Sequence, residues 1–326
     1  MTHLFESLQV IGDPHVSSKR PGRRRAGYTE GLLEKLEACA RLSKERKAFT
    51  VITGDLFHRN DENDLATLTK LARVFKKFYA TVTVYEGNHD KMTESIVDGD
   101  ALMLLAETGS LRVVSTNGPF ERLQIAGCDV QLFCAQFGSE LPTRLQSDSQ
   151  VNILFTHHDL AFEGAYPGAK DLAPIRGCDL LINGHMHKTT PPVTLESTTF
   201  WNPGNIEPLS IDLEDHVPKT WFWVPSNPKF LEGVELPHPE DAFDKSGMLV
   251  DAAEQAEVVE QLEKESAFST AMEEDHSNEA NRTDDASVLS KDVEDVLKER
   301  GASQAVRLML DSLMAKVRDA ALRSEE

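Results

Sequence analysis

The sequence lacks several features that define common classes of protein. Its four cysteines, Cys39, Cys128, Cys134 and Cys178, show no paired spacing and no Cys-x-x-Cys, which gives no disulfide framework and predicts reduced thiols. No apolar run approaches the roughly 20 residues that cross a bilayer, and residues 1–10 lack the basic head and apolar core of a secretion signal. No Gly-x-x-x-x-Gly-Lys-Ser/Thr occurs, so ATP hydrolysis would come from another chain. We therefore expect a soluble, cytoplasmic protein without membrane contact.

Basic side chains are also fewer than acidic ones, and the resulting negative charge is unevenly distributed along the chain. The 326 residues carry a formal net charge of -20. Residues 240–326 hold 23 acidic and 10 basic side chains, so this stretch contributes -13 and the preceding 239 residues only -7. An acidic total normally argues against a polyanionic substrate, because phosphate contacts need Lys and Arg. Since the charge lies mainly in the last part of the chain, the preceding part stays compatible with nucleic acid.

Short apolar runs rich in Val, Ile, Thr and Phe alternate with amphipathic stretches. The runs predict strands buried on both faces at 8–11, 49–53, 81–85, 151–156 and 179–182. Helices are predicted between them, one capped by Thr29, one by Asn63 or Asp64, and one near 95–107 that ends at Gly109. Later runs with hairpin-like spacing predict a second sheet, at 123–125, 130–133, 193–195, 198–201 and 221–224. The predicted fold class is α/β with two sheets.

Five short polar segments hold seven of the eleven histidines. They are Asp13-Pro14-His15, Gly54-Asp55-Leu56-Phe57-His58, Gly87-Asn88-His89-Asp90, His157-His158 and Gly184-His185-Met186-His187. All but the last stand where an apolar run stops, and the carboxyl ends of strands meet at a common edge of a sheet. Their oxygen and imidazole groups suit divalent cations, and a carboxylate that bridges two cations holds them roughly 3.5 to 4 Å apart. The pattern predicts a dinuclear metal site at a single sheet edge.

In this order the segments resemble the pattern of the calcineurin-like metallophosphoesterases: Asp-x-His, Gly-Asp, Gly-Asn-His-Asp, His and Gly-His-x-His. The form Gly54-Asp55-Leu56-Phe57-His58, with Asn202-Pro203-Gly204-Asn205 after the last segment, most resembles the SbcD-type DNA repair nucleases, which work with an SMC-like ATPase. The resemblance implies a two-sheet α/β/β/α metallophosphoesterase sandwich at 1–236. An acidic linker at 237–285 and a C-terminal helical hairpin at 286–326 would follow.

The resemblance also implies a ligand set. Asp13, His15 and His187 would hold one metal, Asn88, His157 and His185 the other, and Asp55 would bridge them. His157 is preferred to His158 because it directly ends its apolar run, whereas His158 would pack beside the site. Mixed Asp, Asn and His ligands without a thiolate favour two Mn²⁺, with Mg²⁺ or another divalent cation as the alternative.

Three further residues would assist the reaction. The resemblance places His89 against the substrate phosphate, where it would stabilise charge or protonate the leaving oxygen. Asp90 would orient His89, and His58 would contact the phosphate or position a nucleotide. The two cations would lower the pKa of a bridging water, so that hydroxide attacks the phosphodiester in line without a covalent intermediate.

A basic cluster follows the first segment. Its cations are Lys19, Arg20, Arg23, Arg24 and Arg25. On a loop beside a phosphodiester-cleaving site they would bind a nucleic-acid backbone without reading its sequence. The alternative is a solvated loop that only raises solubility.

The end of the chain predicts a partner. Residues 288–299 and 303–322 show helical apolar spacing, broken at Gly301, and a helix pair this small buries little surface alone. In the resembled family such a pair grips the coiled coil of the ATPase subunit. The alternatives are docking on its own catalytic domain and self-association as a homodimer.

Three functions remain open at this point. The first is a manganese-dependent DNA nuclease, exonuclease or endonuclease, that acts with an ATPase in repair, recombination or end processing. The second is a phosphoesterase for a small phosphodiester or nucleotide, and the third is a binding module without catalysis. The complete ligand set argues against the third, while the basic loop and C-terminal helices favour the first over the second.

Overall fold

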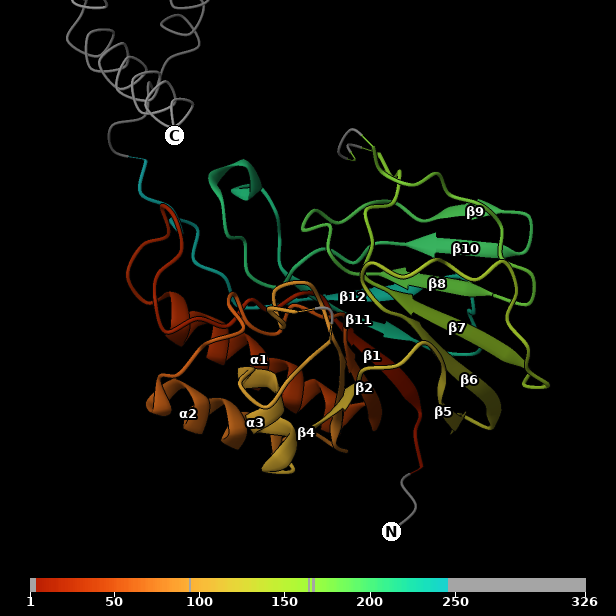
Figure 1. The fold of residues 1–326 in the computed structure, drawn as a ribbon, viewed down its shortest axis with the longest axis horizontal. Helices are drawn as coiled ribbons and strands as arrows, with labels where there is room; N and C mark the ends of the chain where they lie inside the picture. The colour runs from red at the N-terminus through yellow and green to blue at the C-terminus, as the bar shows by residue number, and fades with distance from the viewer. Residues whose placement is uncertain (1–3, 94, 164, 166–167, 246–326) are drawn as a thin grey trace, which may run out of the picture. The chain divides into compact units, whose positions relative to one another are not determined.

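The apolar runs of the sequence form two six-stranded sheets in the part of the chain that the structure describes (Figure 1). This computed structural model describes residues 4–93, 95–163, 165 and 168–245, all within one compact unit, Met1–Ser246. The predicted C-terminal helices and most of the predicted linker lie outside these residues. The predicted two-sheet α/β sandwich is confirmed.

The first sheet has the strand order β12-β11-β1-β2-β3-β4. Its strands are β1 (Ser7–Ile11), β2 (Ala48–Ile52), β3 (Val82–Tyr85), β4 (Leu111–Val114), β11 (Lys219–Trp223) and β12 (Leu231–Glu235). Strands β1 to β4 run parallel, β11 pairs antiparallel with β1, and β12 pairs antiparallel with β11 at the edge of the sheet. Every residue of β1, β2 and β3 is buried, as expected for parallel strands covered on both faces.

The second sheet has the order β5-β6-β7-β8-β10-β9. Its strands are β5 (Gly118–Ile125), β6 (Cys128–Ala135), β7 (Val151–Thr156), β8 (Leu180–Asn183), β9 (Val193–Leu195) and β10 (Thr198–Trp201). The central neighbours β6, β7, β8 and β10 are parallel, with an antiparallel strand at each edge.

The grouping of strands into sheets differs from the prediction in two places. Strands β7 and β8 were predicted beside β1 to β3, but they pair with β6 and β10. Strand β11 was predicted with the later hairpins, but it pairs with β1. Local patterns reveal a buried strand but not its neighbour, because pairing depends on contacts distant in sequence. Strands β4 and β12 were not predicted.

In the described part of the chain, three α-helices pack on the first sheet: α1 (Tyr28–Glu45), α2 (Leu65–Phe75) and α3 (Ala101–Glu107). Asp64 caps α2 as predicted, since its carboxylate accepts from the Thr67 N–H at 2.8 Å. The prediction that Thr29 caps α1 is wrong, because the cap is Gly27 and the Thr29 hydroxyl donates to the Ser17 carbonyl at 2.7 Å. A short 3₁₀ turn, η1 (Ile211–Leu213), precedes β11.

The third predicted helix starts later than expected. It begins at Ala101 rather than near residue 95, and the turn after it contains Gly109 with φ 64°. The Gly109 N–H donates to the Ala106 carbonyl at 2.8 Å, which agrees with the predicted end of the helix at this glycine.

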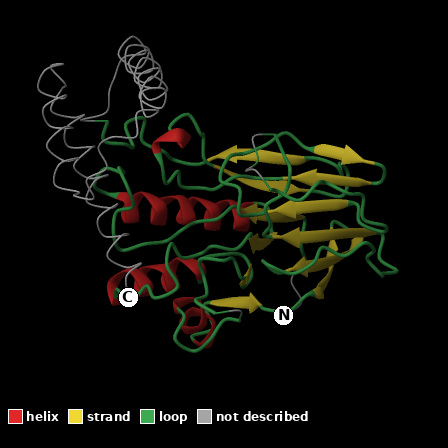
Figure 2. Ribbon diagram, turned by 45° about the horizontal axis from the view of Figure 1, so that its top comes forward, coloured by secondary structure: helices red, strands yellow, loops and turns green. Residues whose placement is uncertain are grey.

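Buried apolar side chains form three layers around the sheets. One cluster joins the helices to the first sheet through residues such as Leu36 and Val84, and α1 to α3 lie grouped together away from β5 to β10 (Figure 2). A second cluster, with Val51 and Phe155, fills the space between the sheets. A third lies on the outer face of the second sheet and includes Phe162. This packing fixes the ends of both sheets relative to each other.

Among the described residues, the structure contains no helix whose length and hydropathy would allow it to span a membrane.

Candidate metal centre

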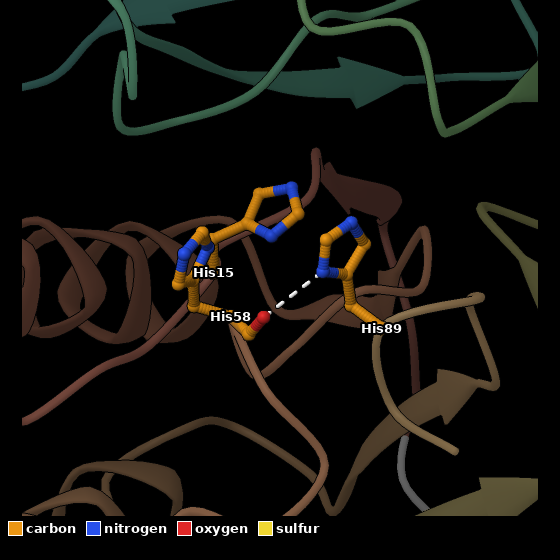
Figure 3. A group of neighbouring side chains, drawn as sticks. All are labelled: His15, His58 and His89. Carbon is orange, nitrogen blue, oxygen red and sulfur yellow. Dashed lines mark hydrogen bonds between the residues drawn. The ribbon is translucent and has the colours of Figure 1, made fainter. Parts of the chain in front are cut away.

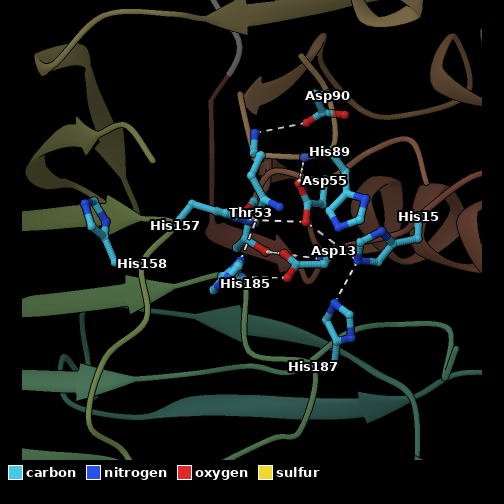
Figure 4. Close-up of polar contacts among 12 residues, drawn as sticks. Asp13, His15, Thr53, Asp55, His89, Asp90, His157, His158, His185 and His187 are labelled. Atoms are coloured by element: carbon cyan, nitrogen blue, oxygen red, sulfur yellow. Dashed lines mark hydrogen bonds and ion pairs between the residues drawn. The ribbon is translucent and has the colours of Figure 1, made fainter. Parts of the chain in front are cut away.

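The predicted ligands follow strands of both sheets and meet where the sheet ends come together (Figure 4). Asp13, Asp55 and Asn88 come after β1, β2 and β3, whereas His157 and His185 come after β7 and β8. Direct contacts join the two groups. Asp55 Oδ2 lies 3.2 Å from His157 Nε2, and the backbone N–H of His185 donates to Asp13 Oδ2 at 2.6 Å. The prediction of a single sheet edge is therefore wrong, because two packed sheets share the site.

Three predicted ligands have a left-handed backbone. The φ angle is 50° at His15, 45° at Asp55 and 75° at His185, a region that costs a non-glycine residue about 1 to 3 kcal/mol. The His15 N–H donates to the Asp55 carbonyl at 2.9 Å, and the bond from His185 to Asp13 holds the third turn. Backbone strain therefore coincides with the predicted ligands, as is common at functional sites.

Two glycines bring the loops into contact. A Cβ atom on Gly87 would overlap Asp55 Oδ1, and one on Gly184 would overlap the Thr53 carbonyl oxygen. The close backbone approach explains why these two segments need glycine.

The first group of ligand atoms surrounds Asn88. Its Oδ1 lies 3.1 Å from His157 Nε2 and 3.0 Å from His185 Nδ1. His157 Nδ1 donates to the Thr53 carbonyl at 2.8 Å, so Nε2 is the ring nitrogen that faces Asn88 and Asp55. Several acceptor atoms thus converge at this point.

The second group surrounds His15. Its Nε2 lies 2.9 Å from His187 Nε2 and 3.8 Å from Asp55 Oδ2. Ligand atoms of Asp13, His15 and His187 all lie within 4.8 Å of one another, as do those of Asp55, His157 and His185. The Thr53 hydroxyl donates to Asp13 Oδ1 at 2.6 Å and orients that carboxylate.

These residues fit divalent cations. Asp55 Oδ2 is buried, and its nearest charge partners among the described residues are the ring nitrogens of His157 at 3.2 Å and His15 at 3.8 Å. A buried carboxylate costs free energy unless a positive charge, from a protonated imidazole or a cation, compensates it. Ligands about 2.1 Å from an octahedral ion lie about 3 Å apart when adjacent, close to the 3.0, 3.1 and 3.2 Å separations around Asn88 and Asp55. The donor set of carboxylate, amide oxygen and imidazole is the one that such ions accept.

Electrostatics keep Asp55, His15 and His187 in the forms that bind cations. Burial opposes ionisation of Asp55, but the neighbouring His157 holds the pKa of this carboxyl well below its usual range. Although burial lowers the pKa of His157, the Asp55 carboxylate raises it to about 9, so this ring is protonated at pH 7 and a bound cation would take the place of the proton on Nε2. Burial lowers the pKa of His187 to about 4 and that of His15 well below its usual range. Asp55 is therefore anionic, while His15 and His187 are neutral at pH 7 and keep a lone pair for a ligand bond.

His58 and His89 form a pair beside His15 (Figure 3). Their rings stack with centroids 5.8 Å apart at 21°, and ligand atoms of all three histidines lie within 4.8 Å of one another. His89 Nδ1 lies 2.9 Å from the His58 carbonyl oxygen, and the backbone N–H of His89 donates to Asp55 Oδ1 at 2.8 Å. The partly exposed His89 is thus fixed next to the candidate metal ligands.

The predicted role of Asp90 needs correction. Its carboxylate accepts from the Phe57 N–H and the Gly87 N–H, both at 3.0 Å, and not from His89. Asp90 therefore joins the two loops that carry Asp55 and Asn88, while the His58 carbonyl orients His89.

The two adjacent histidines after β7 point in different directions (Figure 4). His157 faces Asp55 and Asn88. His158 Nε2 instead lies 2.9 Å from the Ser139 carbonyl oxygen. This geometry agrees with the preference for His157 as the ligand.

The basic loop is only partly available to a ligand. Arg24 is 4% exposed, forms an ion pair with Glu207 and lies over the Phe243 ring at 5.0 Å. Lys35 of α1 binds the other oxygen of Glu207 at 2.7 Å, and both side chains are fully buried. The prediction that Arg24 contacts nucleic acid is therefore wrong, because this guanidinium is part of a buried charge cluster.

The other cations of the loop differ in their surroundings. Lys19, Arg20 and Arg23 are exposed. Arg25 pairs with Asp241 at 3.1 Å, and its backbone N–H donates to the Ala242 carbonyl at 3.0 Å. Residues at the start of the predicted linker thus pack against this loop.

Sequence reasoning missed several supporting residues. Thr53 contacts Asp13 and His157, and Asp159 contacts His185 Nε2 at 3.0 Å. No motif pointed to Asp159, although it stands two residues after His157. The Asn202 amide of the predicted Asn-Pro-Gly-Asn segment donates to the carbonyls of Met186 and Lys188, at 2.7 and 2.8 Å, and so supports the last ligand loop.

A pocket of about 310 Å³ adjoins this last ligand loop. Lys188 and Thr189, which follow His187, line it together with His216, Lys219 and Trp221. It combines an aromatic side chain with two cations, and two aspartates, Asp212 and Asp215, also face it.

Comparison with known proteins identifies the class. The family description "Calcineurin-like phosphoesterase" matches residues 8–189, and the chain therefore belongs to the calcineurin-like phosphoesterases. This family membership confirms the predicted superfamily and indicates hydrolysis of a phosphate ester; the SbcD-type branch stays a prediction. No curated protein matches the chain. Among solved structures, a hypothetical protein from Thermus thermophilus is similar at 12% identity with a TM-score of 0.43, covering 71% of this chain and 100% of that one.

Proposed function

We propose that this phosphoesterase is a manganese-dependent DNA nuclease that works with an SMC-like ATPase subunit. The observation that carries the catalytic part is the convergence of ligand atoms on Asp55: His157 Nε2 and His15 Nε2 lie 3.2 and 3.8 Å from its Oδ2, and ligand atoms of Asp55, His157 and His185 lie within 4.8 Å of one another. Asp13, His15 and His187 would hold one ion, Asn88, His157 and His185 the other, with Asp55 shared. Two such ions, when bound, lower the pKa of a water molecule and neutralise phosphate oxygens. Oxygen and imidazole ligands without a thiolate favour Mn²⁺.

The chain's own residues would position and protonate the substrate. The His58 carbonyl and the Asp55 carboxylate hold the ring and the backbone of His89. In the tautomer that donates Nδ1–H to His58, Nε2 remains for the substrate. When His89 is protonated, Nε2–H can donate to a phosphate oxygen or to the leaving oxygen.

Two features support DNA as the substrate. Lys19 and Arg20 are exposed on the loop that follows His15, where they would contact the phosphate backbone. The predicted helices at 288–299 and 303–322 would bind the ATPase partner, as in the resembled nucleases, with a homodimer as a further possible assembly. These helices lie outside the described residues.

Purified full-length protein tests the proposal directly. We expect end-labelled duplex DNA to be cleaved with Mn²⁺ and to remain intact when EDTA removes the ion. Cyclic nucleotides and an aryl phosphodiester are incubated in parallel. Cleavage of cyclic nucleotides but not DNA would reverse the assignment, and cleavage of none of these substrates with Mn²⁺ would contradict it.

The basic loop gives a separate prediction. Replacing both Lys19 and Arg20 by glutamate should weaken DNA binding about tenfold or more and reduce the salt dependence by about one unit per lost phosphate contact. Hydrolysis of the aryl phosphodiester should not change, because this substrate has no nucleic-acid backbone for the two side chains to contact and all predicted ligands are retained. DNA affinity is measured by fluorescence anisotropy at several salt concentrations.

A matched control replaces Lys70 and Lys76, two exposed cations of α2 and its C-terminal turn, by glutamate. This variant carries the same change in net charge and should bind DNA like the wild type. Equal loss of DNA binding in both variants would show a general charge effect and remove Lys19 and Arg20 from the interface.

The pocket beside His187 favours a second candidate, a phosphoesterase for a nucleotide-sized phosphodiester. Its volume of about 310 Å³ lies at the lower end of the range for small-molecule sites. Trp221 and Lys188 offer an apolar surface and a cation. The same assay, with cyclic nucleotides compared to DNA, decides between the two candidates.

A further inference from the structure

His185 is held at both of its ring nitrogens. Nδ1 lies 3.0 Å from Asn88 Oδ1, within the first group of ligand atoms. Nε2 lies 3.0 Å from the Asp159 carboxylate on the opposite side of the ring. The His185 side chain is 19% exposed and that of Asp159 is 47% exposed, so this contact connects the buried site to the protein surface.

The contact of Asp159 parallels the one that orients His157. There, the Thr53 carbonyl accepts from Nδ1 at 2.8 Å and leaves Nε2 to face the ligand group. At His185 the carboxylate accepts from Nε2 and leaves the Nδ1 lone pair to face Asn88. Each imidazole therefore donates one N–H to an oxygen of the protein and presents its other nitrogen to the same point.

The local structure keeps Asp159 in place. Its carbonyl accepts from the Lys170 N–H at 2.8 Å, and the next residue, Leu160, is fully buried. The Phe137 ring packs on the His185 ring with centroids 5.4 Å apart. The ring orientation of His185 thus depends on packing from Phe137 and on a directional hydrogen bond to Asp159.

We propose that Asp159 is a positioning residue that fixes the tautomer and ring orientation of His185 for a divalent cation. The inference rests on the proposed metal site but assigns a role that no motif of the sequence indicates. The carboxylate also makes the imidazole a better donor to a cation, because negative charge at Nε2–H increases electron density on Nδ1. Asp159 would therefore act, through His185, on the cation that Asn88, His157 and His185 would hold together.

The proposal is tested by the affinity for Mn²⁺ of the full-length protein. Isothermal titration calorimetry should show two bound ions in the wild type, one of them bound about 10- to 100-fold more weakly in Asp159→Ala. Asp159→Asn should retain much of the affinity, since its amide oxygen still accepts from Nε2–H. The Mn²⁺ concentration for half-maximal hydrolysis should rise in Asp159→Ala, while kcat at saturating Mn²⁺ stays near the wild-type value.

Asp171→Ala is the matched control. Asp171 is exposed and follows Lys170, the backbone partner of Asp159, so the variant removes the same charge from the same segment without a contact to His185. Wild-type affinity in Asp159→Ala, or equal weakening in Asp171→Ala, would overturn the proposal for Asp159. A wild type that binds no divalent ion would overturn the metal site itself together with this inference. Thermal unfolding in EDTA should be the same for all variants, because Asp159 is half-exposed.

Discussion

Replacing Asp55 by asparagine is expected to reduce hydrolysis by about 10³-fold or more. Asp55 is the anionic group between the two sets of ligand atoms, with Oδ2 3.2 Å from His157 Nε2 and 3.8 Å from His15 Nε2. The neutral amide removes the negative charge shared by two cations, and a loss of about 4 kcal/mol in transition-state stabilisation corresponds to this factor. Hydrolysis of an aryl phosphodiester at saturating Mn²⁺ measures the effect without dependence on DNA binding.

Thermal unfolding of the same variant distinguishes the loss of bound ions from the loss of the folded structure. The asparagine oxygen can still accept from the His89 backbone N–H, but the variant loses the charge interaction with His157 that lowers the pKa of Asp55. Thermal stability in EDTA should therefore fall moderately while the protein remains folded, whereas the stabilisation by added Mn²⁺ should be lost. Asp148→Asn, at an 84% exposed carboxylate, should change neither quantity. Retention of more than about a tenth of the activity in Asp55→Asn would be inconsistent with a shared ligand.

The second large effect is expected at Glu207, away from the ligands. Glu207 is buried and binds both Arg24 and Lys35. Glu207→Gln leaves two buried cations without an anion, and breaking a buried pair in this way costs about 3 to 5 kcal/mol. The free energy of unfolding, from urea denaturation in EDTA, is the appropriate measurement, because it excludes any contribution from bound metal.

An exposed ion pair supplies the control. Glu232 pairs with Arg46 at 2.8 Å, with side chains 59% and 33% exposed. Glu232→Gln should cost less than about 1 kcal/mol, since solvent screens this pair. Similar costs at Glu207 and Glu232 would show that the buried cluster adds little to stability.

Buried strands and the residues that end them could be predicted from local sequence. The runs before Asp13, Asp55 and His157 form β1, β2 and β7 with bounds within one residue of the prediction. Their apolar composition requires burial on both faces, and the polar residue that follows marks the point where the strand leaves the core. The choice between His157 and His158 followed from the same register and agrees with the structure.

The roles of charged residues outside the motifs could not be predicted in the same way. Arg24 and Arg25 are neighbours in one basic cluster, yet Arg24 is buried against Glu207 while Arg25 is half-exposed beside Asp241. Both partners lie more than 180 residues away along the chain. A charge run in the sequence gives no information on such partners, because ion pairing depends on where the fold brings distant segments together.

The sequence by itself determined the class of chemistry: the order of the Asp, Asn and His segments and the strand ends that present them are local properties, set by burial periodicity and residue type. Only the tertiary structure decided that two sheets rather than one share the site, that Asp90 bonds the backbone of Phe57 and Gly87, and that Asp159 reaches His185. These outcomes depend on strand pairing and hydrogen-bond direction between segments distant in sequence, and the free energy of such contacts is fixed only when the packed core sets their geometry.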